Sequence, residues 1–169
     1  IPLAPVIPKE SLQSKIDKLL LETKVSFKRK SSVPTKNTFV LLNKLAQLIK
    51  EENNIQIEIQ GHTDARGASS LNKRISLYRA EIIKRELIKL GIKETLLKAV
   101  GYGEEQLVKD GAEHYSKLNR RVEFKVIELN VQEVIALNLQ DSINDILKNN
   151  KIEFKRRSSE VTKASLKAL

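Results

Sequence analysis

The sequence predicts an α/β (α+β) domain with the two layers of a sandwich, in which helices cover strands. The first observation is the alternation of isoleucine with polar residues from Ile55 to Gln60, which is typical of a half-buried strand. The second is a set of apolar stripes at three- and four-residue spacing on both sides of that strand, which predict amphipathic helices. Strand and helix patterns alternate from Lys24 to Glu128, so we expect residues 24–128 to form one domain.

Two helices are expected before the Ile55 strand. Residues 11–23 carry leucine and isoleucine at helical spacing and predict a leading helix. Thr35 can cap a second helix, whose apolar stripe consists of Phe39, Leu42, Leu45, Ala46 and Ile49. A short strand is expected between them at 24–28. In front of all these, residues 1–10 contain three prolines and favour an extended tether.

Three further elements complete the expected domain. Residues 71–90 should be helical, and Gly91 should supply the left-handed residue that ends the helix. Strands are expected at 97–102 and at 120–127, where Val122, Phe124 and Val126 share one face. The polar stretch between these strands, 104–118, shows no regular period and should be a loop.

Composition narrows the function classes. Among 169 residues, 31 Lys and Arg face 21 Asp and Glu, and the net charge of +10 favours a polyanionic partner. Nucleic acid is not expected, because aromatic residues are only 4% and form no stacking platform. The longest apolar stretch, 39–49, is interrupted by polar residues and is too short for a bilayer. Membrane attachment is therefore expected only through regions outside this chain.

We expect neither catalysis nor a cofactor. The absence of cysteine excludes disulfides, thiol catalysis and cysteine metal sites. His62 has no second ligand at metal spacing and is expected to be packed or hydrogen-bonded. Ser76 has no base at a fixed spacing, so no nucleophilic triad is indicated. Gly101 and Gly103 lack the lysine and helix of a phosphate loop.

The end of the chain repeats its beginning. Leu12–Leu42 and Leu139–Leu169 align without a gap at a shift of 127, and 13 of 31 residues match. The strongest match pairs Phe27-Lys28-Arg29 with Phe154-Lys155-Arg156. We expect residues 129–169 to be the helix-strand-helix start of a partial second repeat, through which self-association is possible. An accessory segment that adds a strand to the first sheet is the alternative.

One group of polar residues is placed to bind a zwitterion. Asp64 follows the end of the Ile55 strand, and Asn72, Ser76 and Arg79 lie on one face of the next helix. Arg120 shares its parity with Val122 in the last strand and should point to the helix-covered side, whereas Arg121 should point away. Asp64 would bind an ammonium group, and Arg79 a carboxylate. The alternative is that Asp64 caps the following turn and pairs with Arg79 only to hold the fold.

Several short motifs of this sequence are typical of one known family. Taken together and in order, these motifs closely resemble the OmpA-like peptidoglycan-binding domain over roughly residues 25–127. The motifs are Gly61-His62-Thr63-Asp64, Asn72, Ile75-Ser76, Arg79-Ala80, Gly101-Tyr102-Gly103-Glu104 and Asn119-Arg120-Arg121-Val122-Glu123-Phe124.

The resemblance implies a fold, a ligand and a location. The fold is a βαβαβ-type core with a mixed sheet covered by helices. The ligand is the diaminopimelate side chain of peptidoglycan stem peptides, gripped without covalent bonds, and the location is the periplasm of a Gram-negative envelope, tethered to the outer membrane. The ligand-binding residues are Asp64 and Arg79, supported by Thr63, Asn72, Ile75 and Arg120.

The sequence departs from the family pattern in three places. Phe27 is followed by Lys28, Arg29 and Lys30, where family members often carry an acidic residue. Ile75 replaces a leucine, and Leu107 replaces a proline. A cationic entrance favours carboxylates over ammonium groups. The rival interpretation is therefore a structural or assembly module of the same fold whose ligand pocket has drifted.

Overall fold

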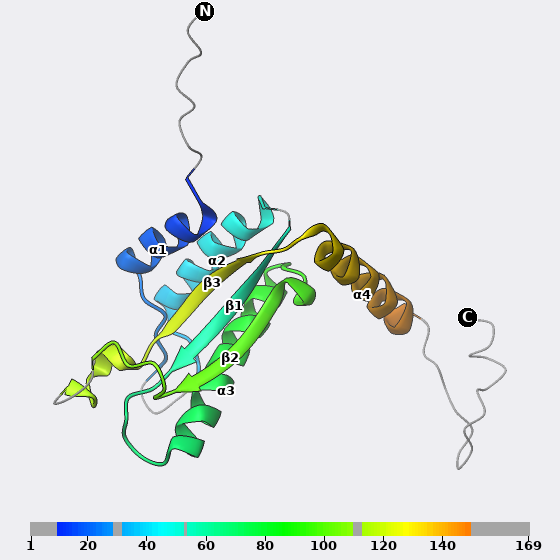
Figure 1. The fold of residues 1–169 in the computed structure, drawn as a ribbon. Coiled ribbons are helices and arrows are strands. Elements are labelled where there is room, and N and C mark those ends of the chain that lie inside the picture. Colours follow the sequence, from blue (N-terminus) through cyan, green and yellow to red (C-terminus); the bar gives the residue numbers. More distant parts are fainter. Residues whose placement is uncertain (1–9, 29–31, 53, 110–112, 150–169) are drawn as a thin grey trace, which may run out of the picture. The chain divides into compact units, whose positions relative to one another are not determined.

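The sheet of this domain is mixed. The computed structural model describes residues 10–28, 32–52, 54–109 and 113–149. Within them, β1 (Ile55–His62) lies between β2 (Leu97–Gly103) and β3 (Val122–Glu128), as Figure 1 shows. β1 pairs parallel with β2 and antiparallel with β3. The expected two-layer α+β architecture with a mixed sheet is confirmed.

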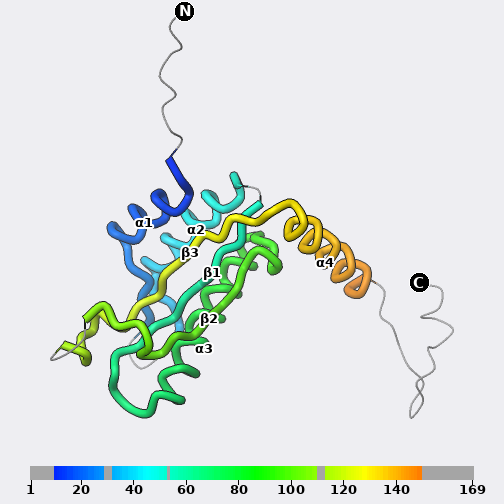
Figure 2. Tube along the Cα trace, viewed as in Figure 1, coloured from blue at the N-terminus to red at the C-terminus, as the bar shows by residue number. Residues whose placement is uncertain are grey.

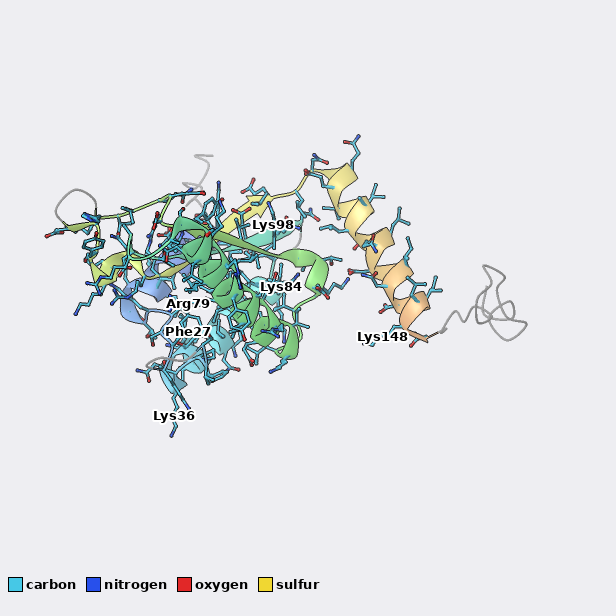
Figure 3. All side chains as sticks on the ribbon, turned by 90° about the horizontal axis from the view of Figure 1, so that it is seen from below. Phe27, Lys36, Arg79, Lys84, Lys98 and Lys148 are labelled. Carbon is cyan, nitrogen blue, oxygen red and sulfur yellow. The ribbon has the colours of Figure 1, made fainter. Side chains whose placement is uncertain are left out.

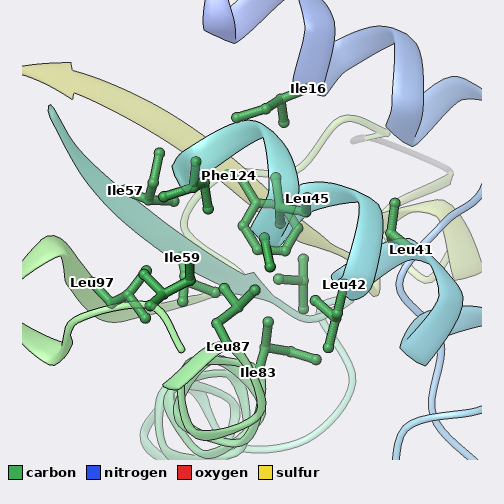
Figure 4. Close-up of a cluster of buried hydrophobic side chains, with 14 of the residues drawn as sticks. Ile16, Leu41, Leu42, Leu45, Ile57, Ile59, Ile83, Leu87, Leu97 and Phe124 are labelled. Carbon is green, nitrogen blue, oxygen red and sulfur yellow. The ribbon is translucent and has the colours of Figure 1, made fainter. Parts of the chain in front are cut away.

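Two helices cover one face of the sheet. α2 (Lys36–Lys50) and α3 (Ser69–Lys89) lie behind the strands in the view of Figure 1, and the trace in Figure 2 follows the same path. Ile57 and Ile59 of β1 point toward these helices and are completely buried. The core that they share with both helices is drawn in Figure 4. Since successive strand residues face opposite sides, Glu58, Gln60 and His62 lie on the other face.

The second helix is capped as expected, but its buried face is shifted. Thr35 accepts a hydrogen bond from the backbone N–H of Thr38 and caps α2. Leu42, Leu45, Ala46 and Ile49 are buried, as the stripe predicts. Phe39 was expected in the core but is 38% exposed, because Thr38 and Leu41 take the inner positions of that turn.

The first helix lies against the edge of the sheet. α1 (Leu12–Glu22) buries Leu12 and Ile16 and contacts α2 and β3. The side-chain amide of Gln13 binds the backbone of β3: Nε2 donates to Phe124 O at 3.0 Å, and Oε1 accepts from Val126 N–H at 2.8 Å. A neighbouring strand would make the same pair of bonds, so Gln13 occupies part of the edge of β3. We call this pair the Gln13 clasp.

Residues 24–28 are an arm rather than the expected strand. Their one strand-like contact is a bridge between Phe27 and Pro34. The backbone of Ser26 bonds instead to the hydroxyl of Thr38, which accepts from Ser26 N–H at 2.9 Å and donates to Ser26 O at 2.8 Å. The strand prediction was wrong because these backbone groups bind the start of α2 and the turn before it, and no strand of the sheet lies next to them in the described residues.

Glycine permits the close approach of α3 to the sheet. A Cβ at Gly61 would overlap the carbonyl oxygen of Ser76, and a Cβ at Gly101 would overlap the backbone nitrogen of Leu77. At the far end of the helix, Gly91 has a φ of +88° and ends α3 as expected. The contact at Gly61 and Gly101 brings the first half of α3 over the ends of β1 and β2.

The segment that follows β3 forms a separate unit, residues 129–169. Its described part is α4 (Val131–Asn149), where Asn130 accepts from Glu133 N–H and Glu133 accepts from Asn130 N–H in a reciprocal cap. The expected tether at 1–10 lies outside the described residues except for Glu10, and so does the part of the expected repeat from residue 150 onward. No described helix is long and apolar enough to cross a bilayer.

Candidate ligand-binding site

The candidate site lies where three strands end or begin. The carboxyl ends of β1 and β2 and the start of β3 meet at one edge of the sheet, at the lower left of Figure 1. Backbone bonds fix this edge: His62 N–H donates to Arg121 O at 2.9 Å, and Thr63 N–H donates to Gly103 O at 2.8 Å. The loops that follow β1 and β2 and precede β3 are therefore held together, and Asp64 stands in the first of them.

Asn72 and Ser76 join α3 to these loops. Asn72 Nδ2 donates to Asp64 O at 3.3 Å and to Glu104 Oε2 at 2.5 Å. Ser76 Oγ accepts from Gly103 N–H at 2.9 Å and donates to the carbonyl of Lys73 at 2.9 Å. Both side chains are buried and use their polar atoms within the protein. They position Asp64 and the end of β2.

Asp64 pairs with Arg120. Its side chain is 7% exposed; Oδ2 accepts from Arg120 Nη1, and Oδ1 accepts from Arg66 N–H at 3.3 Å. The structural alternative predicted that Asp64 would cap its turn and pair with Arg79. The cap is present, but the ion pair is made with Arg120. One carboxylate and one guanidinium of the expected set are thus already in contact.

Arg120 reaches Asp64 from a different element than expected. The sequence placed it in the last strand, but β3 begins at Val122, and residues 117–119 form a 3-10 turn that ends at Arg120. Arg120 therefore precedes the strand, but it points as predicted toward the helix-covered side, since it pairs with Asp64 and repels Arg79 of α3. Arg121 points to the opposite face, as expected: its Nε pairs with Glu123 at 2.5 Å, it lies near the buried His62, and its Nη1 donates to Gln106 O at 3.1 Å.

Arg79 is held by an aromatic ring. Its Cζ lies 5.5 Å from the centre of the Phe27 ring, and Figure 3 shows the two side chains together. Burial, and then repulsion by Arg120, lower the pKa of Arg79 below its ordinary value, whereas Asp64 raises it. An arginine so placed remains charged at neutral pH. Its Nε is buried and has no hydrogen-bond partner among the described residues, which is uncommon for a buried donor.

A hollow of about 730 Å³ lies between the arm, α3 and the loop before β3. It contains three of the expected site residues, Ile75, Arg79 and Arg120, while Thr63, Asp64 and Asn72 are not part of its lining. Sequence reasoning missed most of the rest. Among the described residues, the lining consists of Val25, Ser26, Phe27, Lys28, Ser32, Ile75, Arg79, Lys117, Arg120 and Arg121.

The charges of the hollow are of one sign. Of the described residues that line it, five are cationic and none is acidic. Asp64 is not in the lining, but its negative charge lies close by, because it pairs with Arg120. Thr63 is buried next to it, and its hydroxyl has no partner among the described residues. The arrangement suits a ligand rich in carboxylates, bound by charge-assisted hydrogen bonds to guanidinium groups.

His62 is packed, as the sequence indicated. Its ring is fully buried and stacks on Tyr102, with centroids 5.4 Å apart and planes 10° from parallel. Burial, together with the nearby Arg121, lowers the pKa of His62 to about 4, although Glu123 acts in the opposite direction. The imidazole is neutral at pH 7, and its 3.8 Å contact with Glu123 is therefore not an ion pair.

A mixed sheet with a glycine-mediated helix contact and a cationic hollow at its strand ends defines a small α+β domain with a candidate ligand-binding site. Comparison with known proteins places it in a family: the model described as "OmpA family" matches residues 26–121. This chain belongs to the OmpA family.

Individual relatives agree. Outer membrane porin F of Pseudomonas fluorescens is 35% identical over 107 residues, which are 63% of this chain and 33% of that protein. A peptidoglycan-associated lipoprotein of Buchnera aphidicola is 36% identical over 83 residues, 48% of either chain. This chain thus spans about a third to a half of the length of the curated relatives it matches.

Solved structures support the fold. The peptidoglycan-associated lipoprotein from Burkholderia pseudomallei matches with a TM-score of 0.57 and 28% identity, over 69% of this chain and 100% of that one. The C-terminal domain of Helicobacter pylori MotB matches with a TM-score of 0.53 over 71% of this chain and 94% of that one. Its 18% identity makes it evidence for the fold alone.

Proposed function

We propose that this domain binds peptidoglycan without covalent chemistry and anchors an envelope protein to the cell wall. The observation that carries the proposal is the half-buried Arg79, whose buried Nε is unpaired among the described residues, at a hollow with five cationic residues. The names of the matched lipoproteins support peptidoglycan as the partner. The corresponding location is the Gram-negative periplasm, with an attachment to the outer membrane through regions outside this chain.

The ligand group is the free end of diaminopimelate in a stem peptide, which carries one ammonium and one carboxylate. Arg79 binds the carboxylate through its free donor, and Arg120 stands next to it as a second donor. Ile75 and Phe27 supply the apolar wall for the methylene chain. Thr63 has an unpaired buried hydroxyl beside Asp64, which is a further partner for the ammonium.

The ammonium group must share Asp64 with Arg120. The carboxylate of Asp64 already pairs with Arg120, which offsets much of its negative charge. Its attraction for an incoming ammonium is therefore weakened. The basic residue Lys28 in the lining adds repulsion. We infer that the carboxylate contributes more to affinity than the ammonium, and that attraction weakens as salt screens the cations over about 8 to 10 Å.

Retention on purified sacculi tests the site. Arg79→Ala should reduce retention at least tenfold, because a charge-assisted bidentate contact is worth roughly 1.5 to 3 kcal/mol. Asp64→Ala should reduce it less. Arg85→Ala is the matched control, since it removes the same charge from an exposed position on the same helix. If circular dichroism shows both variants to be folded and the Arg79 and Arg85 variants are retained equally, the assigned site is wrong.

Competition distinguishes diaminopimelate from a general anion. A stem peptide that contains meso-diaminopimelate should release the domain from sacculi, and the same peptide with L-lysine at that position, which lacks the free carboxylate, should not. Calorimetric titration with a diaminopimelate-containing peptide should give heat with the wild type and none with Arg79→Ala. If the wild type gives no heat, the drifted assembly module becomes the better account, since only the fold would then be retained.

A further inference from the structure

The helix α4 repeats α1 in sequence and in internal bonding. At the shift of 127, Gln13 corresponds to Gln140, and Asp17 corresponds to Asn144. In α1, Gln13 Nε2 donates to Asp17 Oδ1 at 2.8 Å; in α4, Gln140 Nε2 donates to Asn144 Oδ1 at 2.9 Å. The two helices therefore carry the same amide in the same local setting.

The apolar stripes of the two helices differ in exposure. In α1, Leu12 and Ile16 are 7% and 0% exposed, because this helix lies against α2 and β3. Their counterparts in α4, Leu139 and Ile143, are 60% and 49% exposed. The stripe of α4 continues with Ile146 and Leu147, at 51% and 50%. Removing such a stripe from water is favourable, so α4 has an apolar face suited to burial.

The surface that such a helix binds is visible in the structure. We call it the α1 seat: the flank of α2 together with the edge of β3, whose Phe124 O and Val126 N–H are met by Gln13. A helix that binds this seat needs an apolar stripe to pack against α2 and a side-chain amide beside the stripe to bond the edge of β3. On a helical wheel, Gln140 stands beside the stripe of α4 at the angle that Gln13 has in α1.

We propose that α4 binds the α1 seat of a second copy of this chain, where it displaces α1, so that two copies exchange helices reciprocally. Every copy carries both the seat and α4. The exchange buries the apolar stripe of α4 and exposes that of α1, so the free energies of monomer and dimer differ little. The fraction of dimer should therefore depend on protein concentration. The proposal is independent of wall binding, since it uses α1, α4 and the edge of β3.

Sedimentation of the full chain at increasing concentration tests the exchange. The wild type should form a dimer whose fraction rises with concentration. Ile143→Asp should weaken the dimer at least tenfold, since it places a charge where Ile16 is buried in α1. Asn144→Asp is the matched control: it adds the same charge one residue away, reproduces the Asp17 of α1, and should leave the dimer unchanged.

The two glutamines give opposite predictions. Gln13→Ala weakens α1 in its seat and should strengthen the dimer about threefold to tenfold, whereas Gln140→Ala should weaken it by a similar factor. Direct pairing of α4 with α4 would leave the Gln13 variant unchanged, and that result overturns the proposal. A wild type that stays monomeric at all concentrations also overturns it, as does equal behaviour of Ile143→Asp and Asn144→Asp.

Discussion

The guanidinium of Arg79 lies over the ring of Phe27, with 5.5 Å between Cζ and the ring centre. Arg79 belongs to α3, and Phe27 belongs to the arm that precedes α2. The arm has no strand partner in the described sheet; it is held by its bridge to Pro34 and by Thr38. The position of the proposed ligand-binding arginine therefore depends on a segment outside the sheet.

Phe27→Leu should lower wall retention about threefold to tenfold while the domain stays folded. The substitution keeps an apolar wall but removes the ring face, and a contact of this kind contributes roughly 0.5 to 2 kcal/mol. Phe27→Tyr keeps the ring and should bind like the wild type. Retention assays on both variants give the comparison; equal loss in both would argue against a role for the ring.

Thr38→Val should disturb the arm at a distance from the ligand. Valine has the same shape but loses both hydrogen bonds to Ser26, which we expect to cost about 1 to 2 kcal/mol of the free energy of unfolding. Wall retention should fall together with protection of the Ser26 amide from hydrogen exchange. Thr38→Ser, which keeps the hydroxyl, is the control. If the valine variant lost stability but bound normally, Thr38 would not position Phe27.

Gly61→Ala should be strongly destabilising. The new Cβ would overlap the carbonyl of Ser76, and backbone on both sides leaves little freedom to adjust, so we expect a loss of about 3 kcal/mol or more in denaturant titrations. Gly67→Ala separates this clash from backbone strain. Gly67 has a φ of +89° with no atom near its Cβ position, and its substitution should cost only about 1 to 2 kcal/mol.

His62 should make the domain less stable in acid. Its folded pKa of about 4 lies below the value near 6.5 of an unfolded chain, so the unfolded state binds a proton that the folded state lacks between these values. This contribution is complete above pH 6.5 and declines by on the order of 3 kcal/mol as the pH falls to 4. His62→Phe should flatten the pH dependence of the unfolding free energy across this window.

The control for that measurement is His114→Gln, which keeps His62 and should keep the slope. The chain has only these two histidines, so the two variants together cover every histidine of the sequence. Phenylalanine can retain the stacking on Tyr102, and His62 has no hydrogen-bond partner among the described residues that would be lost. A slope unchanged by His62→Phe would contradict the assigned pKa.

Local patterns sufficed for most of the fold. The alternation of Ile55, Ile57 and Ile59 marked the central strand because its period of two is a direct result of strand geometry. Thr35 and Gly91 marked helix ends because capping depends on one residue. The strand prediction for residues 24–28 was wrong. Their alternation resembles a strand, but the backbone of Ser26 bonds to Thr38, which is twelve residues away in the sequence.

Local sequence patterns predicted less of the candidate site than of the fold. The spacing of Asn72, Ser76 and Arg79 on α3 predicted a common face, and the structure has it. The Asp64–Arg120 pair and the Phe27–Arg79 contact each join residues far apart in the chain, so no local period could reveal them. The roles of Lys117 and Arg121 in the hollow follow from the 3-10 turn before β3, which shifted the start of that strand by two residues from the expected one.

The Gln13 clasp also has a mechanical consequence. It joins the first helix to the last strand, so the points where the chain enters and leaves this domain are tied by two hydrogen bonds of one side chain. Tension between the flanking segments would be resisted first by these two bonds and by the packing of α1, and only later by the ladder between β1 and β3. Under the proposed wall anchoring, α1 would detach first under load and could bind again afterwards, while the sheet next to the hollow stays folded.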